Sequence, residues 1–498
     1  MANYHIGLDF GTSQTKICLL NKDTGVREFI KFDNDNYFLP SLIVKKADNT
    51  FSYGNENENG IKYRYFKMAA AEDDHLVQVT NEDLEGNLPN GTIDDFRKYS
   101  TEYDIKPEIV VVLYLTYSYL FVIEKKNIQI SNEEYDFFDD DDESEVIKNT
   151  FSINLGIPTE WNNPNHIRRK IKFQSLLIAA IELANQFENI DLYLKAKDTD
   201  LISKIVAINE KYLSELEGKD ENEKAALIQQ WLKKYKLSVF PESAAGVNYL
   251  LKTGRLADGA YATLDIGAGT SDIAIFEVAN NELKKYYCSE SVEIASNDFY
   301  REYAKQYYNK DFVTFEEIKD IEGIIRSDET INEKYYKNAL SNVKGFLNGK
   351  GIEFAVRKIF YRNYYMPLYQ INQVRAFNVK NVILHEKPII VFGGGANLRG
   401  FCEGNYCYFP DPMIRVNADN KNIVATPITD FVNQVDIADE DKVKPFINLL
   451  ILALGLTYSD LDNNDSIPFV IPENDVPPPT PQNNDRYFYY DLQDAAYK

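Results

Sequence analysis

The stretch "YHIGLDFGTSQTKICLL", residues 4–20, sets the architecture that we expect for this chain of 498 residues. Two apolar runs flank a centre made of an acid, a glycine and small hydroxyl residues. Apolar runs joined by a short glycine turn are typical of a β-hairpin. Glycine lets backbone N–H groups approach a phosphate closely, and Thr12 and Ser13 add hydroxyl donors. The stretch therefore predicts a hairpin with a phosphate-binding turn, and a plain hairpin without a ligand is the alternative.

A second stretch in the middle of the chain repeats this pattern. "GLDFGTSQTKICLL", from residue 7, and "TLDIGAGTSDIAIF", from residue 263, both read as a strand ending in Leu-Asp, a glycine turn and a second strand. Two such copies indicate a duplicated fold with a site between them. Carboxylates at strand ends can hold the waters of a magnesium ion, which makes Asp9, Asp265 and Asp272 the candidate metal-ordering residues.

A third glycine turn follows an apolar run late in the chain, at Gly393-Gly394-Gly395. It lacks the G-x-G-x-x-G spacing of a dinucleotide-binding turn, and we expect it to lie against a flat base or sugar. No G-x-x-x-x-G-K-[ST] motif occurs at any of the three turns, so a P-loop is not expected.

The overall composition limits the classes of partner. Asp and Glu outnumber Lys and Arg by 77 to 54, which gives a formal net charge of −23. Such a surface repels nucleic acid and anionic membranes, so we expect neither as a partner. Four cysteines are too few for a disulfide framework: Cys18, Cys288, Cys402 and Cys407. The beginning of the chain shows no signal-peptide pattern, and we expect a cytoplasmic protein.

Periodicity predicts a mixed α/β chain. The apolar run over 109–123 falls short of the length that spans a bilayer, so no membrane insertion is expected. It is interpreted as a buried helix, and its β-branched residues leave a strand as the alternative. The acidic segment over 132–145 is interpreted as a solvated loop. Strands are expected within the first 46 residues and over 151–157, 260–278 and 387–392, and helices over 167–187, 198–236, 241–254, 297–377 and 445–461. Abundant Asn, Lys and Tyr favour a bacterial source.

Four motifs in order resemble one known superfamily. "GLDFGTSQTK", "PESAAGVNYLL", "LDIGAGTSDIAIF" and "VFGGGANL" are similar to the phosphate-1, connect-1, phosphate-2 and adenosine motifs of actin-like ATPases. That superfamily contains actin, the sugar kinases and the seventy-kilodalton heat-shock chaperones. The second phosphate motif and "NLGIPTEWN" look most like the nucleotide-binding domain of the DnaK-type chaperones. The resemblance covers roughly residues 4–460.

The resemblance implies an α/β fold of two lobes, each a ribonuclease-H-like domain with a mixed sheet flanked by helices. Lobe I would span 1–253, with an acidic insertion at about 132–145 and a helical insertion at about 198–236. Lobe II would span 258–430, and a crossing helix over 440–465 would return to lobe I. The remaining 466–498 would form a tail rich in Pro and Asn, and we expect no peptide-binding domain in this stretch.

The resemblance also assigns site residues. Asp9 and Asp265 would order Mg²⁺ through water, and Asp272 or Asp265 would orient or deprotonate the attacking water. A catalytic lysine follows the third strand in the family; Lys62 and Lys67 are both candidates, and we assign Lys67. The remaining residues implied to bind ATP or ADP are Gly11, Thr12, Ser13, Gln14, Gly267, Ala268, Gly269, Thr270, Lys344, Asn348, Gly393, Gly394, Gly395 and Asn397.

Two departures from the family pattern concern the same site. The family places an acid before the proline of connect-1, whereas here Pro241 precedes Glu242, which leaves the role of Glu242 open. "IASNDFY", from residue 294, stands where the family has a glycine-rich turn, and it contains no glycine.

The first functional hypothesis is a slowly hydrolysing Mg-ATP switch that signals lobe closure to a protein partner. The alternative is a bacterial actin-like ATPase that forms oligomers or filaments, since open head-to-tail contacts generate filaments. A sugar kinase is disfavoured because the sequence has no distinct sugar motif. A scaffold that binds nucleotide without hydrolysis is a fourth hypothesis.

Overall fold

The structure is a computed structural model in which a large part of the chain is described. The described residues are 2–32, 36–71, 105–134, 149–159, 167–252, 256, 259–280, 282–292, 295–327, 331–350, 390–398 and 449–458. The predictions for the acidic segment beyond residue 134, the helices beyond 350, Cys402, Cys407 and the tail lie outside these ranges.

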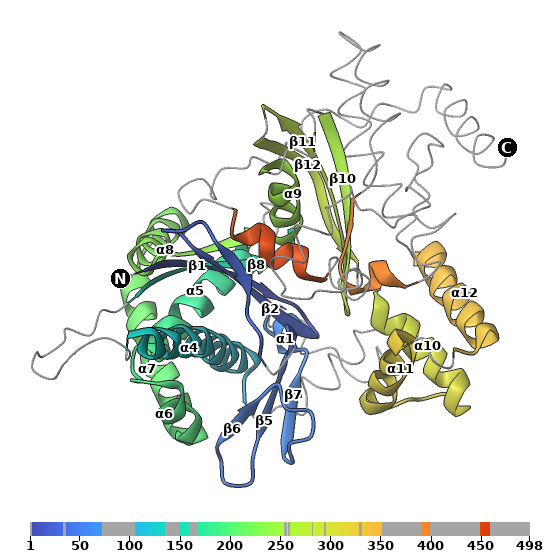
Figure 1. The fold of residues 1–498 in the computed structure, drawn as a ribbon, viewed down its shortest axis with the longest axis horizontal. Coiled ribbons are helices and arrows are strands. Elements are labelled where there is room, and N and C mark those ends of the chain that lie inside the picture. Colours follow the sequence, from blue (N-terminus) through green and yellow to red (C-terminus); the bar gives the residue numbers. More distant parts are fainter. Residues whose placement is uncertain are drawn as a thin grey trace, which may run out of the picture.

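The first large sheet is built around the hairpin of β1 and β2 (Figure 1). Its strands follow the order β3-β2-β1-β8-β9, and β4 pairs with β2 at the side. β1 is antiparallel to β2 and parallel to β8, which is parallel to β9. The predicted N-terminal hairpin is therefore confirmed. The strands are β1 (Asn3–Phe10), β2 (Gln14–Asn21), β3 (Arg27–Phe29), β4 (Leu39–Pro40), β8 (Thr150–Ile157) and β9 (Leu237–Pro241).

The second large sheet repeats this order. Its strands run β12-β11-β10-β13, where β10 and β11 form an antiparallel hairpin and β13 is parallel to β10. This matches β3-β2-β1-β8 strand for strand, so the echo seen in the sequence corresponds to a repeated sheet topology. The strands are β10 (Gly259–Ile266), β11 (Ser271–Ala279), β12 (Glu282–Val292) and β13 (Ile390–Phe392).

The segment "FLPSLIVKK", residues 38–46, lies within the part of the chain where strands are expected, but it does not form one continuous strand. β4 ends at Pro40, and the chain then enters a separate small sheet of order β6-β5-β7. Proline has no N–H to donate to a ladder. Ser41 after it bonds to the β1–β2 turn twice: its backbone N–H donates to the Ser13 carbonyl at 2.9 Å, and its hydroxyl donates to the Gly11 carbonyl at 2.7 Å. The small sheet consists of β5 (Leu42–Lys45), β6 (Phe51–Tyr53) and β7 (Ile61–Arg64).

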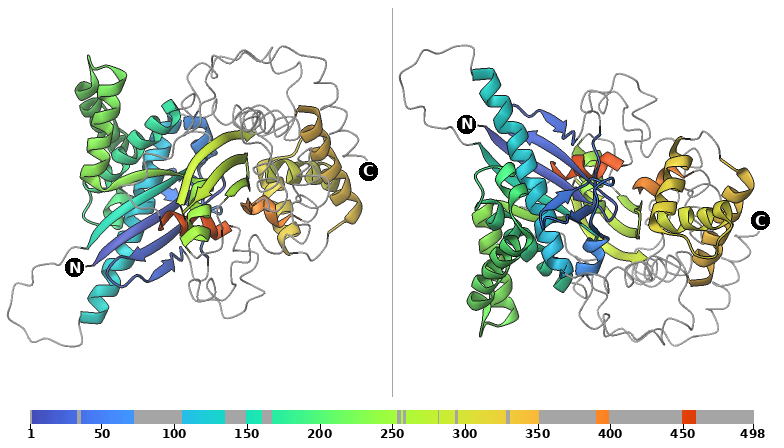
Figure 2. Two further views of the ribbon diagram at one scale, coloured as in Figure 1. Left: turned by 90° about the horizontal axis from the view of Figure 1, so that it is seen from above. Right: turned by 90° about the horizontal axis from the view of Figure 1, so that it is seen from below.

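Helices cover the first sheet on its outer side, and α10–α12 lie at the opposite end of the molecule (Figure 2). The predicted helix near residue 108 is confirmed as α4, and its segment 110–115 is buried. Within the described ranges, one helical stretch, Pro107–Lys126, has the length and hydropathy of a membrane span, and 56% of its most apolar window is buried inside the protein.

The helices bear out the periodicity predictions that fall on described residues. They are α1 (Phe66–Ala71), α4 (Pro107–Glu134), α5 (Ile167–Ala184), α6 (Ile190–Lys195), α7 (Asp198–Leu216), α8 (Glu221–Tyr235), α9 (Glu242–Lys252), α10 (Ser296–Tyr308), α11 (Phe315–Ser327), α12 (Glu333–Lys350) and the 3₁₀ turn η5 (Gly394–Asn397). We call the first sheet and the small sheet, together with α1 and α4–α8, the first half of the molecule. The second sheet and α9–α12 are its second half.

A short apolar helix over 449–456 lies between the first sheet and α9 (red in Figure 1). Its buried side chains belong to the same hydrophobic core as α9 and the second sheet. Its carboxyl end is tied to the first sheet, because the Asn154 side chain on β8 donates to the Leu456 carbonyl at 2.8 Å. The helix therefore joins the two halves. The buried face of α9 belongs to this core, which also contains Cys18, Phe29 and Phe240 of the first half.

Candidate functional site

The two hairpin turns border one cleft between the halves. The cleft holds about 730 Å³ of empty space, part of it open to solvent. The β1–β2 turn lines it from the first half, and the β10–β11 turn lines it from the second. The predicted site residues that border the cleft are Asp9, Gly11, Thr12, Ser13, Gln14, Lys67, Asp265, Gly267, Ala268, Thr270, Asp272, Gly393 and Gly394.

The two hairpins carry different charges at equivalent positions. In the first, Asp9 on β1 is the cross-strand partner of Lys16 on β2, and the two side chains form a buried ion pair at 3.0 Å. In the second, Asp265 on β10 is the cross-strand partner of Asp272 on β11. The cleft therefore has an ammonium group beside one turn and a second carboxylate beside the other.

A second buried ion pair stands next to the first. Lys67, on α1, donates to Glu242 Oε1 at 2.9 Å, and both side chains are almost fully buried. Glu242 is the first residue of α9, so this pair connects the two halves. Lys62 points elsewhere and donates to the Glu56 carbonyl at 2.8 Å within the small-sheet region. Of the two candidate lysines, the structure places Lys67 in the cleft.

The buried carboxylates influence one another. Burial, together with the charges of Glu242, Asp272 and Asp9, raises the pKa of Asp265 well above its usual value. Burial also raises the pKa of Glu242, although the Lys67 ammonium opposes this effect. These surroundings favour a protonated carboxyl at Asp265, and a cation close to it would favour the ionised form.

We expect the variant Asp265→Asn to be more stable than the wild type at pH 7–8 in the absence of ligand. The pKa of an Asp carboxyl is near 4 in the unfolded chain. When folding raises this pKa, the stability contributed by the carboxyl is fully present at pH values below 4 and is lost as the pH rises through the pKa of the folded state. The gain in the free energy of unfolding should therefore vanish towards pH 4 and grow as the pH rises to 8. Thermal melting between pH 4 and 8 measures it.

The control for this experiment is Asp311→Asn, which changes an exposed acid in the loop before α11. Melting curves of the wild type and Asp265→Asn that stay parallel over the whole pH range would contradict the assignment.

The other end of the cleft is formed by the glycine turn after β13. Gly393 has a φ of +83°, and a Cβ there would lie 2.4 Å from Asp265 Oδ1. Only glycine fits such a position, because the left-handed backbone and the close approach both exclude a side chain. Gly394 lies beside Leu449 and the Arg326 guanidinium, which gives this end of the cleft a flat, apolar and basic wall.

The amino end of α10, where "IASNDFY" lacks glycine, forms hydrogen bonds with the turn of the second hairpin. The backbone N–H of Ser296 donates to the Gly267 carbonyl at 3.2 Å, and that of Asn297 donates to the Ala268 carbonyl at 3.0 Å. The Ser296 hydroxyl also donates to Gly267. The amino end of α10 therefore supports the turn of the second hairpin, and both backbone N–H groups already donate to carbonyls of that turn.

Two predicted site residues in the described part of the structure, Gly269 and Gly395, do not border the cleft. Gly395 packs on β10, where a Cβ would lie 2.2 Å from the Ile266 side chain, and Gly269 is buried within its turn. Neither glycine is among the residues that border the cleft, and their assignment to nucleotide binding stays a prediction. The backbones of Lys344, Asn348 and Asn397 lie in α12 and η5, but their side chains are outside the described part of the structure.

Sequence reasoning missed three charged residues that border the cleft: Lys16, Glu322 and Arg326. Hairpin geometry could have found Lys16, since a four-residue turn makes it the neighbour of Asp9. Glu322 and Arg326 lie one turn apart on α11 and form an ion pair at 2.7 Å. No local signal distinguishes this pair from an ordinary pair on a helix surface.

The residues around the cleft suit an ion that is held through its waters. Among the residues that the structure describes, no group of three or more His, Cys, Asp and Glu side chains is arranged to hold a metal ion directly. Asp9 and Asp265 nevertheless border the same cleft from opposite hairpins. Carboxylates in this arrangement can accept hydrogen bonds from the water shell that Mg²⁺ usually keeps.

Neither the models of known protein families nor the sequences of curated proteins match this chain. The fold and the cleft are therefore the basis for assigning a function.

Proposed function

We propose that this chain is an Mg-ATP-binding switch of the actin-like superfamily, which hydrolyses ATP slowly and signals closure of its two halves to a partner protein. One observation carries the proposal: two hairpins of the same topology present equivalent turns to a single cleft. A polyphosphate placed there would be held from both sides by turn N–H groups and hydroxyls. The particular likeness to DnaK-type chaperones belongs to the proposal and rests on the sequence motifs.

The charges of the cleft support a nucleotide that is accompanied by a divalent cation. Five acids border it, namely Asp9, Glu242, Asp265, Asp272 and Glu322, and three bases, namely Lys16, Lys67 and Arg326. ATP alone would add negative charge to a cleft in which carboxylates already outnumber cations. Mg²⁺ held through waters on Asp9 and Asp265 would offset the phosphate charge.

The protein groups then have separate roles. Lys16 and Lys67 provide fixed positive charge for the phosphates, and Thr12 and Ser13 provide hydroxyl donors. Arg326 and the glycine turn offer a flat wall on which a base can stack. These assignments place the phosphates at the hairpin turns and the base near Leu449.

Hydrolysis requires a proton acceptor for the attacking water. Asp265 is already assigned to the waters of Mg²⁺, so we assign the role of proton acceptor to Asp272, its cross-strand partner on β11. Water attacks the γ-phosphorus, the bond to the β–γ bridging oxygen breaks, and the proton of the water passes to the Asp272 carboxylate. The products are ADP and inorganic phosphate.

Titration calorimetry with ATP and Mg²⁺ tests the proposal. We expect one binding site, and the variant Lys16→Met should bind ATP at least about 10-fold more weakly, a difference of about 1.4 kcal/mol, because a buried phosphate partner is lost. Lys22→Met is the matched control, since Lys22 is exposed at the far end of the same hairpin. Thermal melting checks that each variant is folded. Failure of the wild type to bind ATP or to release phosphate would refute the proposal.

A further inference from the structure

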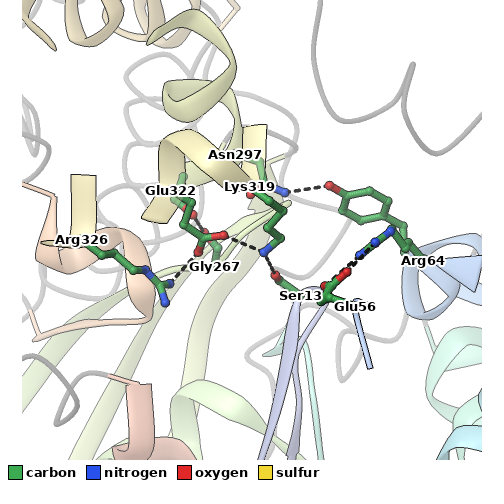
Figure 3. Close-up of polar contacts among 10 residues, drawn as sticks. Ser13, Glu56, Arg64, Gly267, Asn297, Lys319, Glu322 and Arg326 are labelled. Carbon is green, nitrogen blue, oxygen red and sulfur yellow. Dashed lines mark hydrogen bonds and ion pairs between the residues drawn. The ribbon is translucent and has the colours of Figure 1, made fainter. Parts of the chain in front are cut away.

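Two polar contacts join the halves beside the cleft (Figure 3). Lys319, on α11, donates from Nζ to the Ser13 hydroxyl at 2.8 Å. Asn297, on α10, donates from Nδ2 to the Tyr65 hydroxyl at 3.1 Å. Both donors come from the second half and both acceptors from the first, so the halves cannot separate here without breaking both contacts.

Lys319 is oriented by its own helix. Its ammonium group also donates to Glu322 Oε2 at 2.6 Å, and the other oxygen of that carboxylate pairs with Arg326. Burial would raise the pKa of Glu322, but the charges of Lys319 and Arg326 outweigh this and hold it below its usual value. The carboxylate is therefore ionised, and it keeps the Lys319 ammonium directed at Ser13.

The acceptor Tyr65 is also held in a specific conformation. It is buried and adopts a φ of 57°, which is uncommon for a large side chain and has to be imposed by its surroundings. Tyr65 immediately precedes α1, the helix that carries Lys67 into the cleft. The two contacts therefore end on the first phosphate turn and on the segment that positions the cleft lysine.

We propose that these two contacts form a latch, with Lys319 as a positioning residue that holds the Ser13 hydroxyl and sets how long nucleotide stays bound. This inference rests on the proposed function, because it requires that nucleotide lies between the halves. In this proposal separation of the halves is the step that releases nucleotide, and separation breaks both contacts. A contact from a charged donor is stronger than a neutral one, so Lys319 should contribute more to the latch than Tyr65 does.

The rate of nucleotide release tests the latch. A fluorescent ADP analogue bound to the full chain is chased with excess ATP, and its dissociation is followed in a stopped-flow instrument. We expect release to be about 10-fold faster in Lys319→Met and about 3-fold faster in Tyr65→Phe. The conservative variant Lys319→Arg should restore a rate within about 3-fold of the wild type, because it keeps a charged donor.

Matched controls exist for both variants. Lys305, on α10, forms an ion pair with Glu302 at 2.8 Å, as Lys319 does with Glu322, and the two lysines are similarly exposed. The Lys305–Glu302 pair lies within α10 and does not involve the first half. Tyr53 is buried and bonds to Tyr193 within the first half. Lys305→Met and Tyr53→Phe should therefore leave the release rate unchanged.

A second measurement separates the latch from the proposed function. Hydrogen exchange of the amides over 11–16 in nucleotide-free protein should rise in Lys319→Met and stay the same in Lys305→Met. Unchanged exchange, or an unchanged release rate in both latch variants, would overturn the latch. If the wild type failed to bind nucleotide but Lys319→Met still showed faster hydrogen exchange over 11–16, the proposed function would be overturned. The two contacts would then serve only to hold the halves together.

Discussion

Replacing Asp272 with asparagine is expected to slow single-turnover ATP hydrolysis at least about 100-fold while ATP binding is retained. The amide cannot accept the proton of the attacking water, and positioned proton acceptors typically contribute about 10²–10⁴-fold to rate. Asp272 is buried opposite Asp265 in the second hairpin, so its replacement also removes a negative charge from an acidic cleft. ATP affinity should therefore be equal to that of the wild type or higher.

The measurement is a rapid-quench experiment with enzyme in excess over ATP, together with calorimetry for affinity. Glu277→Gln is the matched control, since it makes the same acid-to-amide change on β11 at a residue that does not border the cleft. Equal hydrolysis rates in the wild type and Asp272→Asn would show that Asp272 is not the proton acceptor. Loss of ATP binding in Asp272→Asn alone would assign it a binding role instead.

The second large effect concerns stability and does not depend on the function. We expect Gly455→Ala to lower the free energy of unfolding by about 3 kcal/mol, the upper range for an added methyl group in a close-packed core. Gly455 lies in the helix that joins the halves, and a Cβ there would lie 1.8 Å from the Ala245 carbonyl oxygen on α9. The neighbour is backbone, so it cannot move aside as a flexible side chain would.

Urea unfolding measures this difference, and Gly323→Ala provides the control. Gly323 lies on α11, and a Cβ there meets no atom within 4 Å. The same substitution should therefore stabilise the protein at this site by about 0.5–1 kcal/mol, because alanine favours a helix over glycine. If both variants gained stability, the close approach of the helix to α9 would be wrong.

Much of the local structure could be predicted from the sequence. The hairpin at Asp9, the hairpin at Asp265 and the apolar helix near residue 450 follow from apolar periodicity and from the position of glycine. These features depend on neighbours within a few residues, so a single chain contains the necessary information. The end of β4 at Pro40 also depends on local sequence, but the apolar residues on both sides of Pro40 made the segment look like one continuous strand.

The local sequence does not determine which of Lys62 and Lys67 lies in the cleft. Lys62 lies on β7 and Lys67 on α1 directly after it, and no spacing rule in the sequence separates the two. The structure directs Lys67 to Glu242, 175 positions further along the chain, and Lys62 to the nearby Glu56 carbonyl. Glu322 and Arg326 were missed for the same reason, since their helix reaches the cleft only through packing.

The amino-acid order alone thus established the two glycine turns, the carboxylates that precede them and the repeat that relates them. Their meeting at one cleft, the pairing of Lys67 with Glu242 inside it and the contact of Lys319 with Ser13 emerged only from the folded chain. Turn conformation and strand pairing of a hairpin are short-range properties. The cleft depends on how two hydrophobic cores pack against each other and on the helix over 449–456 that joins them, and such packing brings together residues that are more than 300 positions apart.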